Sequence, residues 1–393
     1  MTAALAGLRV VDFTTTIAGP HCTRLLADLG ATVIKIEAPD GDMMRTRPPL
    51  RDGASAMFGQ LNINKQSVVL DLKNPDGVAA ARKLIAGADV LVENYRPGVM
   101  QRLGLDYPSL SATNPRLVYC AISGYGQTGP SANLAAYAPV VQAASGYELT
   151  HIFYQDGRTK PDNMGIWVAD VISGTYAFGA ISAALHQRAT TGRGQFVDVS
   201  MLECMLTLPL LELQSSQFPF VMASRRFAEP LKTADGYIIV AIASELTFQG
   251  AAAATGNPGW VTDPRFAKYA DRRLNWGEFI GELEAWMGTR TTADCVATLS
   301  RHGVPCSAYR TVAEALKDPQ LKHRQALVEV TDEAGPYIAL NQPFQMSELP
   351  PRSTATSPAL GEHTEEVLGA LGYSEAEIAA LSGRATAAKA AAE

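Results

Sequence analysis

The chain has 393 residues, of which 47% are apolar and 18% charged, so it is not intrinsically disordered and is long enough for two domains. Its formal net charge is −6 and no block of lysine or arginine stands out, which argues against a nucleic-acid partner. Its five cysteines form no C-x-x-C pair and have no histidine nearby at ligand spacing. We therefore expect reduced thiols, a cytoplasmic location and no metal site.

The first 125 residues predict a regular alternation of strands and helices. Strands rich in valine, isoleucine and leucine are expected at 8–14, 32–39, 66–73, 89–95 and 116–123. Helices are expected at 21–30, from Pro75 onward and at 98–105. Continuous apolar strands that alternate with helices indicate a parallel sheet covered on both faces. The predicted fold class is therefore a doubly wound, Rossmann-like α/β domain.

A glycine motif follows the strand at 116–123. Gly124, Gly126 and Gly129 form a literal G-x-G-x-x-G, the pattern of a dinucleotide-binding turn. That turn belongs after the first strand of its unit and opens a helix, whereas here it follows about the fifth strand and Pro130 interrupts the chain. We therefore do not expect NAD binding. We interpret the motif as a tight loop at the carboxyl edge of the sheet, where ligands of open α/β sheets bind.

The stretch 168–185 is long and apolar enough to resemble a membrane span, but it contains Asp170 together with glycine and serine. A helix buried in the core explains it better. Asp170 begins the helix expected at 170–188, and an aspartate in that position often only caps the helix. Because apolar residues follow it, we expect the carboxylate at a core boundary, ionised by the helix N-terminus and able to attack an activated acyl group.

The composition changes after about Phe220. A hairpin is expected around Asp235–Gly236 and is followed by polar helices, so we interpret 226–328 as a small α+β domain and 1–225 as the first part of a large domain. Residues 329–393 begin as an extended connector rich in proline, serine and threonine and continue as helices. They end in a low-complexity tail that we expect to be frayed.

Other candidate residues are less specific. The patterns G-x-S-x-G and H-E-x-x-H are absent, which argues against serine and zinc hydrolases, and the six histidines are interpreted as surface or capping residues. Four basic residues lie near strand ends or helix starts and could together hold a polyphosphorylated ligand, although each alone is typical of a solvated surface: Lys65, Lys73, Arg96 and Arg102.

Seven segments, in order between about residues 7 and 371, together resemble one family. They are GLRVVDFTTTIAGPHCTRLLADLGATVIKIEAP, NINKQSVVLDLKNPDG, DVLVENYRPGVMQRLGL, ISGYGQTGP, TGRGQFVDVSMLE, HGVPCSAY and LGEHTEEVL. They are similar to the class III CoA-transferases, the family of formyl-CoA and carnitine CoA-transferases that also includes α-methylacyl-CoA racemases. The resemblance implies a homodimer of two interlocked, ring-like subunits, each with a large Rossmann-like domain and a small domain. It also implies that the segment 329–393 returns to the large domain.

The resemblance implies the chemistry as well. Asp170 matches the family's catalytic aspartate, which attacks the donor thioester to give a mixed anhydride and then an aspartyl-CoA thioester. A carboxylic acid accepts the CoA by the reverse steps. Coenzyme A and its acyl thioesters are then substrates, and no tightly bound cofactor, metal ion or membrane partner is expected. The positions that match CoA-contacting residues are Ala18, Leu70, Lys73, Asn94, Tyr95, Arg102 and Leu103, with Tyr137 matching a tyrosine beside the aspartate.

Two departures from the formyl-CoA transferases bear on the substrate. Ile17 and Ala38 replace a glutamine and an arginine, and the run of glycines that covers the active site in those enzymes is absent. Formate and oxalate are therefore unexpected substrates. Arg45, Arg47 or Lys65 would have to compensate for the arginine missing from the phosphate site.

Three alternatives remain. A racemase or epimerase of the same fold needs a second acid/base, but Tyr137 stands where the racemases have a histidine, and a tyrosine with a pKa of about 10 shuttles protons poorly near neutral pH. A non-catalytic acyl-CoA-binding subunit is another alternative, and an NAD enzyme is the last.

A second carboxylate of the substrate, as in a C4 or C5 dicarboxylate, could meet Tyr154, Arg158, Arg225 and Arg226.

Overall fold

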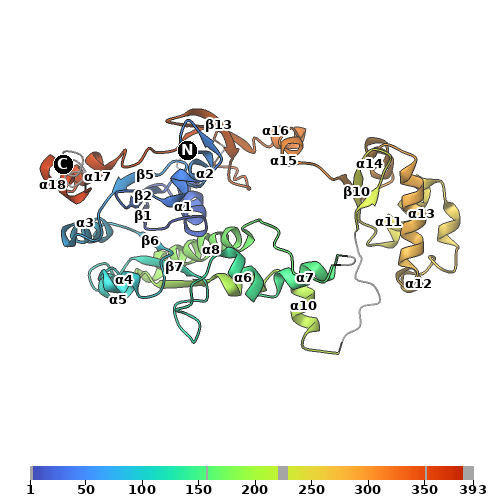
Figure 1. Cartoon of the computed structure of the whole chain (residues 1–393), viewed down its shortest axis with the longest axis horizontal. Coiled ribbons are helices and arrows are strands. Elements are labelled where there is room, and N and C mark those ends of the chain that lie inside the picture. Colours follow the sequence, from blue (N-terminus) through green and yellow to red (C-terminus); the bar gives the residue numbers. More distant parts are fainter. Residues whose placement is uncertain (1–2, 156–157, 220–228, 350–351, 384–393) are drawn as a thin grey trace. The chain divides into compact units, whose positions relative to one another are not determined.

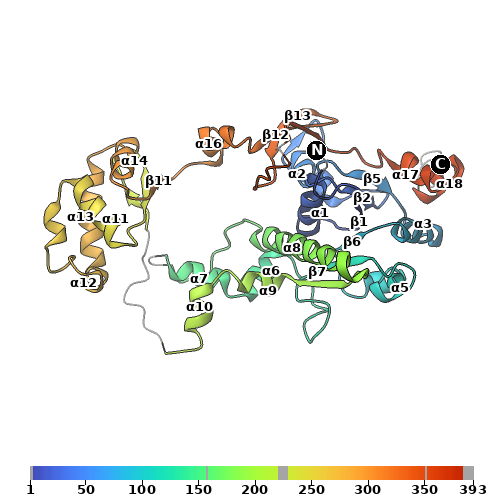
Figure 2. The ribbon, with the colours of Figure 1, turned by 180° about the vertical axis from the view of Figure 1, so that it is seen from behind.

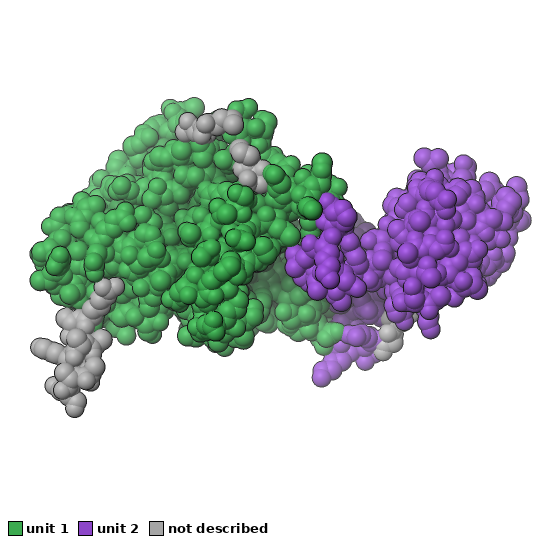
Figure 3. All heavy atoms as spheres, turned by 90° about the horizontal axis from the view of Figure 1, so that it is seen from above, with its two compact units in different colours: residues 1–149, 161–210, 320–393 green, residues 150–160, 211–319 purple. Residues whose placement is uncertain are grey.

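The computed structural model describes residues 3–155, 158–219, 229–349 and 352–383. The chain divides into two compact units, of which unit 1 comprises residues 1–149, 161–210 and 320–393 and unit 2 comprises residues 150–160 and 211–319 (Figure 3). The small domain expected at 226–328 therefore overlaps unit 2. Figures 1 and 2 show the elements of both units from opposite sides.

Unit 1 is built on a six-stranded sheet in which every neighbouring pair is parallel. Its strands, in spatial order, are β5 (Gln66–Val69), β2 (Thr32–Glu37), β1 (Arg9–Asp12), β6 (Val90–Glu93), β7 (Val118–Ser123) and β8 (Phe196–Ser200). The chain starts in the middle, builds one half outward through β2 and β5, and then returns to build the other half from β6. This is the order of the doubly wound dinucleotide-binding fold, and it confirms the predicted α/β class.

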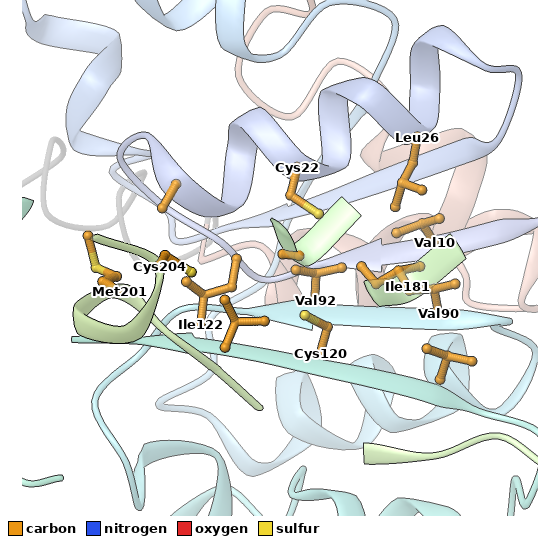
Figure 4. Packing of buried hydrophobic residues seen from close by; sticks show 14 of the residues in the cluster. Val10, Cys22, Leu26, Val90, Val92, Cys120, Ile122, Ile181, Met201 and Cys204 are labelled. Carbon is orange, nitrogen blue, oxygen red and sulfur yellow. The ribbon is translucent and has the colours of Figure 1, made fainter. Parts of the chain in front are cut away.

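One face of the sheet is covered by α1 (Ala18–Asp28) and α8 (Val168–Thr191), together with α6 (Ala138–Ala144) and α9 (Met201–Leu206). Figure 4 shows Cys22 and Leu26 of α1 pointing toward the strands that carry Val92 and Cys120. These side chains are almost fully buried because the strands are apolar on this face, as parallel strands covered by helices are expected to be.

The other face packs against α3 (Pro75–Ala86) and, from the far end of the chain, α17 (Thr364–Ala370) and α18 (Glu375–Leu381). The segment around α17 also covers the edge strand β5. Val69 N donates to Thr364 Oγ1 at 3.1 Å, and His363 N donates to Ser67 O at 3.0 Å. The edge of the sheet is thus closed by residues almost 300 positions later in the chain. Short helices α4 (Val99–Arg102) and α5 (Tyr107–Ser111) connect β6 to β7.

The 24-residue helix α8 is, among the described residues, the one helix long and apolar enough to cross a membrane by length and composition. It begins at Val168, two residues before the expected start, and ends where Gly192 adopts a left-handed conformation. Ala177, Ile181 and Ala184 are buried against the sheet, whereas Val171 and Tyr176 are exposed. The helix therefore packs in the core on one face only.

A small three-stranded sheet completes unit 1. Its order is β13 (Gly335–Leu340), β12 (Leu327–Asp332) and β14 (Thr354–Thr356). Arg51, in the short hairpin of β3 (Leu50–Arg51) and β4 (Ala54–Ser55), pairs with Asp332 at 2.8 Å and stacks on Tyr337. The remaining elements are the 3-10 helix η1 (Met43–Thr46) and α2 (Ala56–Leu61). Three helices lie where the chain passes between the units: α7 (Tyr147–Phe153), α10 (Leu210–Ser215) and α16 (Pro319–His323).

Unit 2 has an antiparallel sheet of β11 (Cys306–Ala308), β10 (Tyr237–Val240) and β9 (Leu231–Lys232). The β9–β10 hairpin lies where the sequence predicts it. Asp235 stabilises its turn by accepting a hydrogen bond from Thr292 N at 2.7 Å. Phe279 contacts four other aromatic rings at the centre of the core. The helices around it are α11 (Glu245–Thr255), η2 (Pro258–Val261), α12 (Tyr269–Leu274), α13 (Trp276–Gly288) and α14 (Thr292–Arg301). The short helix α15 (Val312–Ala315) follows β11 in the chain and has no buried residue.

Candidate active site

A cavity of about 790 Å³ opens in unit 1 at the carboxyl ends of β1, β6 and β7. The strand order reverses between β1 and β6, so the cavity lies at the point where doubly wound sheets bind their ligands. Its size suits a small-molecule ligand. The lining is mostly apolar and comes from the residues that follow the strands, including Thr15–Ala18, Met43, Met44, Arg47, Met57, Asn94–Pro97, Ser123, Gly124, Leu134, Tyr137–Pro139, Trp167, Asp170 and Met201.

Four helices begin at this cavity. Ala18, Ala138 and Met201 are the first residues of α1, α6 and α9, and Asp170 is the third residue of α8. The first amides of a helix have no partner within the helix, and the helix N-terminus carries a partial positive charge. The cavity wall is therefore suited to stabilising negative charge on a bound group.

Asp170 is the one acidic residue among the cavity lining, all of which lies in described parts of the chain. Burial raises the pKa of its carboxyl group to about 6, and the backbone N–H of Ala18 opposes that rise by hydrogen bonding to the ionised form. The carboxylate is still mostly ionised at neutral pH. It is thus a poorly hydrated carboxylate next to a hydrogen-bond donor, which suits nucleophilic attack on an activated acyl group.

A glycine lets the two long helices bring Ala18 and Asp170 together. A Cβ atom added at Gly174 of α8 would lie 2.4 Å from Ala18 O and 3.0 Å from the ring of His21. Only a glycine tolerates so close an approach of the first turn of α1. His21 Nε2 lies 3.3 Å from Thr175 Oγ1, and burial, together with nearby Arg24, lowers the pKa of His21 to about 4, so the ring is neutral.

Buried ion pairs hold the turn between β1 and α1 in place. Lys65 Nζ contacts Asp12 Oδ2 at 3.0 Å and donates to Pro20 O at 3.1 Å, with neither charged side chain exposed. Burial lowers the pKa of Lys65 to about 8, and burial would raise that of Asp12 but is outweighed by Lys65 and Lys35, which lower it. Lys65, a candidate for binding phosphate in the sequence, is therefore fully engaged inside the protein.

A second pair supports the outer side of the same turn. Lys35 Nζ donates to Asp42 Oδ2 at 2.9 Å and to Thr14 O at 2.8 Å. Asp42 Oδ1 in turn accepts from Thr16 N at 3.4 Å, and Thr16 has a φ of +71°, a left-handed conformation that is unusual for a β-branched residue. The side chain of Asn94 forms two further hydrogen bonds with the backbone of Thr15. Its Oδ1 accepts from Thr15 N and its Nδ2 donates to Thr15 O, both at 2.9 Å. The turn that presents Ala18 is therefore held from both sides.

The structure separates the residues matched to CoA contacts into two groups. Ala18, Asn94, Tyr95 and Tyr137 line the cavity with Asp170. The others do not line it: Leu70 has a fully buried side chain, Lys73 is exposed in the turn before α3, and Arg102 and Leu103 lie at the end of α4.

The glycine motif reaches the cavity through its first residue. Gly124 follows β7 and lines the wall, and a Cβ atom there would lie 2.3 Å from Cβ of Ala136. That contact draws the segment before Tyr137 toward the end of the strand. The expectation of a tight loop at the carboxyl edge that leads to Tyr137 and approaches Asp170 agrees with this arrangement.

The residues suggested for a second carboxylate lie elsewhere. Tyr154 and Arg158 belong to unit 2, where Tyr154 donates a hydrogen bond to Glu212. Arg225 and Arg226 lie outside the described residues. Trp167, an exposed aromatic residue of the cavity lining, is not among the candidates predicted from the sequence, although its place three positions before Asp170 is a usable signal.

A doubly wound α/β fold with a partly buried carboxylate and several helix N-termini at its switch point defines a protein that binds an anionic or activated acyl ligand. The family follows from comparison. The chain belongs to CoA-transferase family III, whose model matches residues 5–364.

Curated relatives and solved structures resemble the chain over nearly its whole length. It is 33% identical to the succinate–glutarate CoA-transferase of Agrobacterium fabrum, covering 93% of this chain and 95% of that one. It is 35% identical to a formyl-CoA:oxalate CoA-transferase of Bradyrhizobium, covering 97% and 96%. A CaiB/BaiF family protein from Brucella suis, 33% identical, superimposes with a TM-score of 0.80 over 94% of this chain and all of that one. The names of the curated relatives indicate CoA-transferase activity.

Proposed function

We propose that the protein transfers CoA from an acyl-CoA to a carboxylic acid through covalent intermediates on Asp170. The observation that carries the proposal is the position of this carboxylate, which lies in the cavity at the switch point, where the backbone N–H of Ala18 favours its ionised form. Membership of CoA-transferase family III supports the reaction class.

The first half of the reaction moves CoA onto the protein. An oxygen of Asp170 bonds to the thioester carbon of the donor, the carbon–sulfur bond breaks, and CoA leaves as a thiolate. The thiolate then attacks the carbonyl carbon of Asp170, and the bond to the donor carboxylate breaks. The products are an aspartyl-CoA thioester and the free donor acid, with no net change in protons. Each intermediate contains one activated carbonyl, first in the mixed anhydride and then in the thioester on Asp170, so little free energy is lost.

The second half repeats these steps with the acceptor. A carboxylate oxygen of the acceptor attacks the aspartyl thioester, CoA thiolate leaves, and the thiolate then attacks the acceptor's carbonyl carbon to release the Asp170 carboxylate. Every tetrahedral intermediate carries an oxyanion. Because α1 and α8 both begin at the cavity, their first backbone amides are candidate donors to it, and donors fixed in advance lower such a barrier most.

We propose a C4 or C5 dicarboxylate as one of the acids. Among the relatives, one is named for succinate and glutarate, and a second for succinyl-CoA and D-citramalate. Formate and oxalate fit less well because Ile17, an apolar residue of the cavity lining, stands where the formyl-CoA enzymes have glutamine. The acceptor panel should therefore include acids of both lengths.

We also propose a cytoplasmic homodimer. The exposed face of α8 carries Val171 and Tyr176, and Ile166 and Trp167 are exposed just before the helix. An apolar face of this kind on a helix next to the active site suits burial against a second copy of the chain. Light scattering on the purified protein tests this assembly, and a monomer at micromolar concentration would contradict it.

The decisive experiment traps the intermediate. The protein is incubated with succinyl-CoA, quenched with hydroxylamine, digested and analysed by mass spectrometry, with Asp170→Asn as the control of matched shape. A hydroxamate at Asp170 in the wild type alone supports the proposal. Transfer activity in the asparagine variant contradicts it. Uptake of solvent deuterium at the α-carbon without labelling of Asp170 would instead indicate a racemase, and CoA binding without turnover would indicate a non-catalytic subunit.

A further inference from the structure

Two arginines of the cavity have no side-chain partner in the part of the chain that the structure describes. Arg47 and Arg96 line the cavity, both are exposed, and neither guanidinium makes a hydrogen bond or an ion pair with any described residue. Asp170 is the one acidic residue of the lining. The cavity thus offers two unpaired cations to a ligand that must approach a carboxylate, which suits a ligand with more than one anionic group.

Arg47 differs sharply from Arg45, which lies only two residues earlier. Arg45 forms two hydrogen bonds with Glu37 at 2.8 and 2.7 Å, donates to Pro358 O at 3.2 Å and stacks on Phe58. Its guanidinium is therefore occupied by the fold itself. Arg47 follows the end of η1 in an extended conformation, with φ −91° and ψ 138°, and it is one of the residues that line the cavity. Of the residues considered as replacements for the missing basic residue at 38, only Arg47 is available.

The backbone that carries Arg47 is firmly anchored. Asp42 caps η1 by accepting from Met44 N at 2.9 Å, its own N–H donates to Glu37 Oε2 at 3.0 Å, and its carboxylate is paired with buried Lys35. The backbone from which Arg47 projects is therefore fixed before any ligand arrives. A fixed backbone reduces the entropy that is lost when the side chain pairs with a ligand.

We propose that Arg47 binds the free carboxylate of a dicarboxylate substrate while the other carboxyl group reacts at Asp170. This inference rests on the proposed function. The two carboxyl groups of a C4 or C5 acid are only a few bonds apart, so both must fit in the cavity that contains Asp170. The cavity lining also contains Met43, Met44 and Met57, and a carboxylate buried against such apolar side chains needs a charged partner. A planar guanidinium can pair with it through two hydrogen bonds.

The phosphates of CoA are the other possible source of an oxyanion for Arg47. They have other cations available, because Arg96 follows β6 beside Asn94 and Tyr95, and Lys73 and Arg102 are exposed outside the cavity. The free carboxylate of the acyl group has Arg47 and Arg96 as its candidate partners in the lining. For this reason we assign Arg47 to the free carboxylate of the substrate rather than to a phosphate of CoA.

The test compares Arg47→Met and Arg47→Lys with Arg96→Met, which removes the other unpaired cation of the same cavity. Because Arg47 is exposed and unpaired, the variants should fold, and thermal melting checks this. Transfer from acetyl-CoA, a donor that lacks a free carboxylate, is measured to succinate and glutarate against butyrate and valerate, which have the same lengths but lack the second carboxylate. We expect Arg47→Met to lower kcat/KM for the dicarboxylates about tenfold or more and to leave the monocarboxylates unchanged, because a site built for a polar group discriminates strongly. Arg47→Lys should recover part of the loss.

A phosphate role gives a different pattern. If Arg47 holds a CoA phosphate, Arg47→Met lowers kcat/KM equally for both classes of acid and abolishes the preference for CoA over 3′-dephospho-CoA, and either result overturns the proposal. Titration of succinate and butyrate into the protein with CoA present gives a readout that needs no turnover. Equal affinities of wild type and Arg47→Met for succinate would also overturn it. Labelling of Asp170 by hydroxylamine does not depend on these outcomes. The role of Arg47 can therefore be disproved while covalent transfer through Asp170 stands, and the reverse.

Discussion

Lys35 Nζ and Asp42 Oδ2 lie 2.9 Å apart, and neither side chain is accessible to water. Burial would lower the pKa of Lys35, but Asp42 and Asp12 outweigh it and raise the pKa, so the lysine is charged at neutral pH. The pair connects two features of the site. Lys35 holds Thr14 O of the turn that presents Ala18, and Asp42 caps the short helix that leads to Arg47.

Removal of Lys35 should therefore affect stability and activity together. In Lys35→Met the carboxylate of Asp42 remains buried without its partner, which costs about 3–5 kcal/mol of unfolding free energy. Chemical denaturation measures the loss, and kcat should fall because the turn before Ala18 is no longer held. Lys73→Met, which removes an exposed lysine of the same unit, should change the unfolding free energy by less than about 0.5 kcal/mol. Equal midpoints for the two variants would show that the buried pair contributes nothing.

The pKa of about 6 for Asp170 predicts the acidic limb of the pH profile. The protonated carboxyl group cannot attack a thioester, so kcat/KM should fall about tenfold for each pH unit below 6 and stay level above it. A limb centred near the ordinary aspartate value of 3.8 would contradict this prediction.

The raised pKa of Asp170 also predicts that the folded protein loses stability over the pH range in which its activity increases. The folded-state pKa of Asp170 is raised above its unfolded value, so the folded protein binds the proton more tightly and loses stability as the pH rises from about 4 through 6. Asp170→Asn should therefore stabilise the protein at pH 7, by on the order of 1 kcal/mol after allowance for partial solvent exposure, while abolishing transfer. The gain should vanish at pH 4. Denaturation at both pH values measures it, and a gain of equal size at pH 4 would point to a cause other than ionisation.

Two glycines of α8 form a matched pair for testing the approach of α1. A Cβ atom at Gly174 would lie 2.4 Å from Ala18 O, whereas one at Gly179 meets no atom within 4 Å. Gly174→Ala should destabilise the protein by about 1–3 kcal/mol and lower kcat, because Ala18 is pushed away from Asp170. Gly179→Ala should be neutral or stabilising by up to about 1 kcal/mol, because alanine favours the helix. If both variants keep full activity, the close approach of the helices does not position the site.

The exposed face of α8 predicts how assembly responds to charge. Tyr176→Lys places a cation on the apolar face, and a charge left unpaired in an interface opposes association. We expect a shift from dimer to monomer in light scattering. Lys160→Glu alters a charge outside this helix and serves as the control, which should leave the assembly unchanged.

Much of the sheet could be predicted because five of its strands are buried on both faces and read as continuous apolar runs. The strand β8 was not predicted, since it lies at the edge, where Phe196 and Asp198 are exposed and the apolar run is broken. Asp170 and the glycine loop were also singled out from the sequence, because each stands next to the end of a predicted element, whereas Tyr137 was proposed only from the family resemblance.

The roles of the basic residues could not be predicted in the same way. Lys65 pairs with Asp12, which is 53 positions away, and Arg45 pairs with Glu37 on the preceding strand. The roles of these two basic residues therefore depend on tertiary contacts. Arg45 and Arg47 look alike in the sequence. Only the fold shows that the first is used by the protein and the second faces the cavity.

The segment around α17 covers the edge strand β5, and this affects how the chain folds while it is being synthesised on the ribosome. Ser67 and Val69 are made early, yet their partners His363 and Thr364 leave the ribosome almost 300 residues later. Until then the edge of the parallel sheet presents unpaired backbone groups, which are prone to pairing with other chains. Unit 2 lies between these two parts of the sequence and has its own core, so it can fold while unit 1 is still incomplete. A nascent chain of this protein is thus expected to depend on chaperones that shield an open strand, and to be released from them only when α17 has docked.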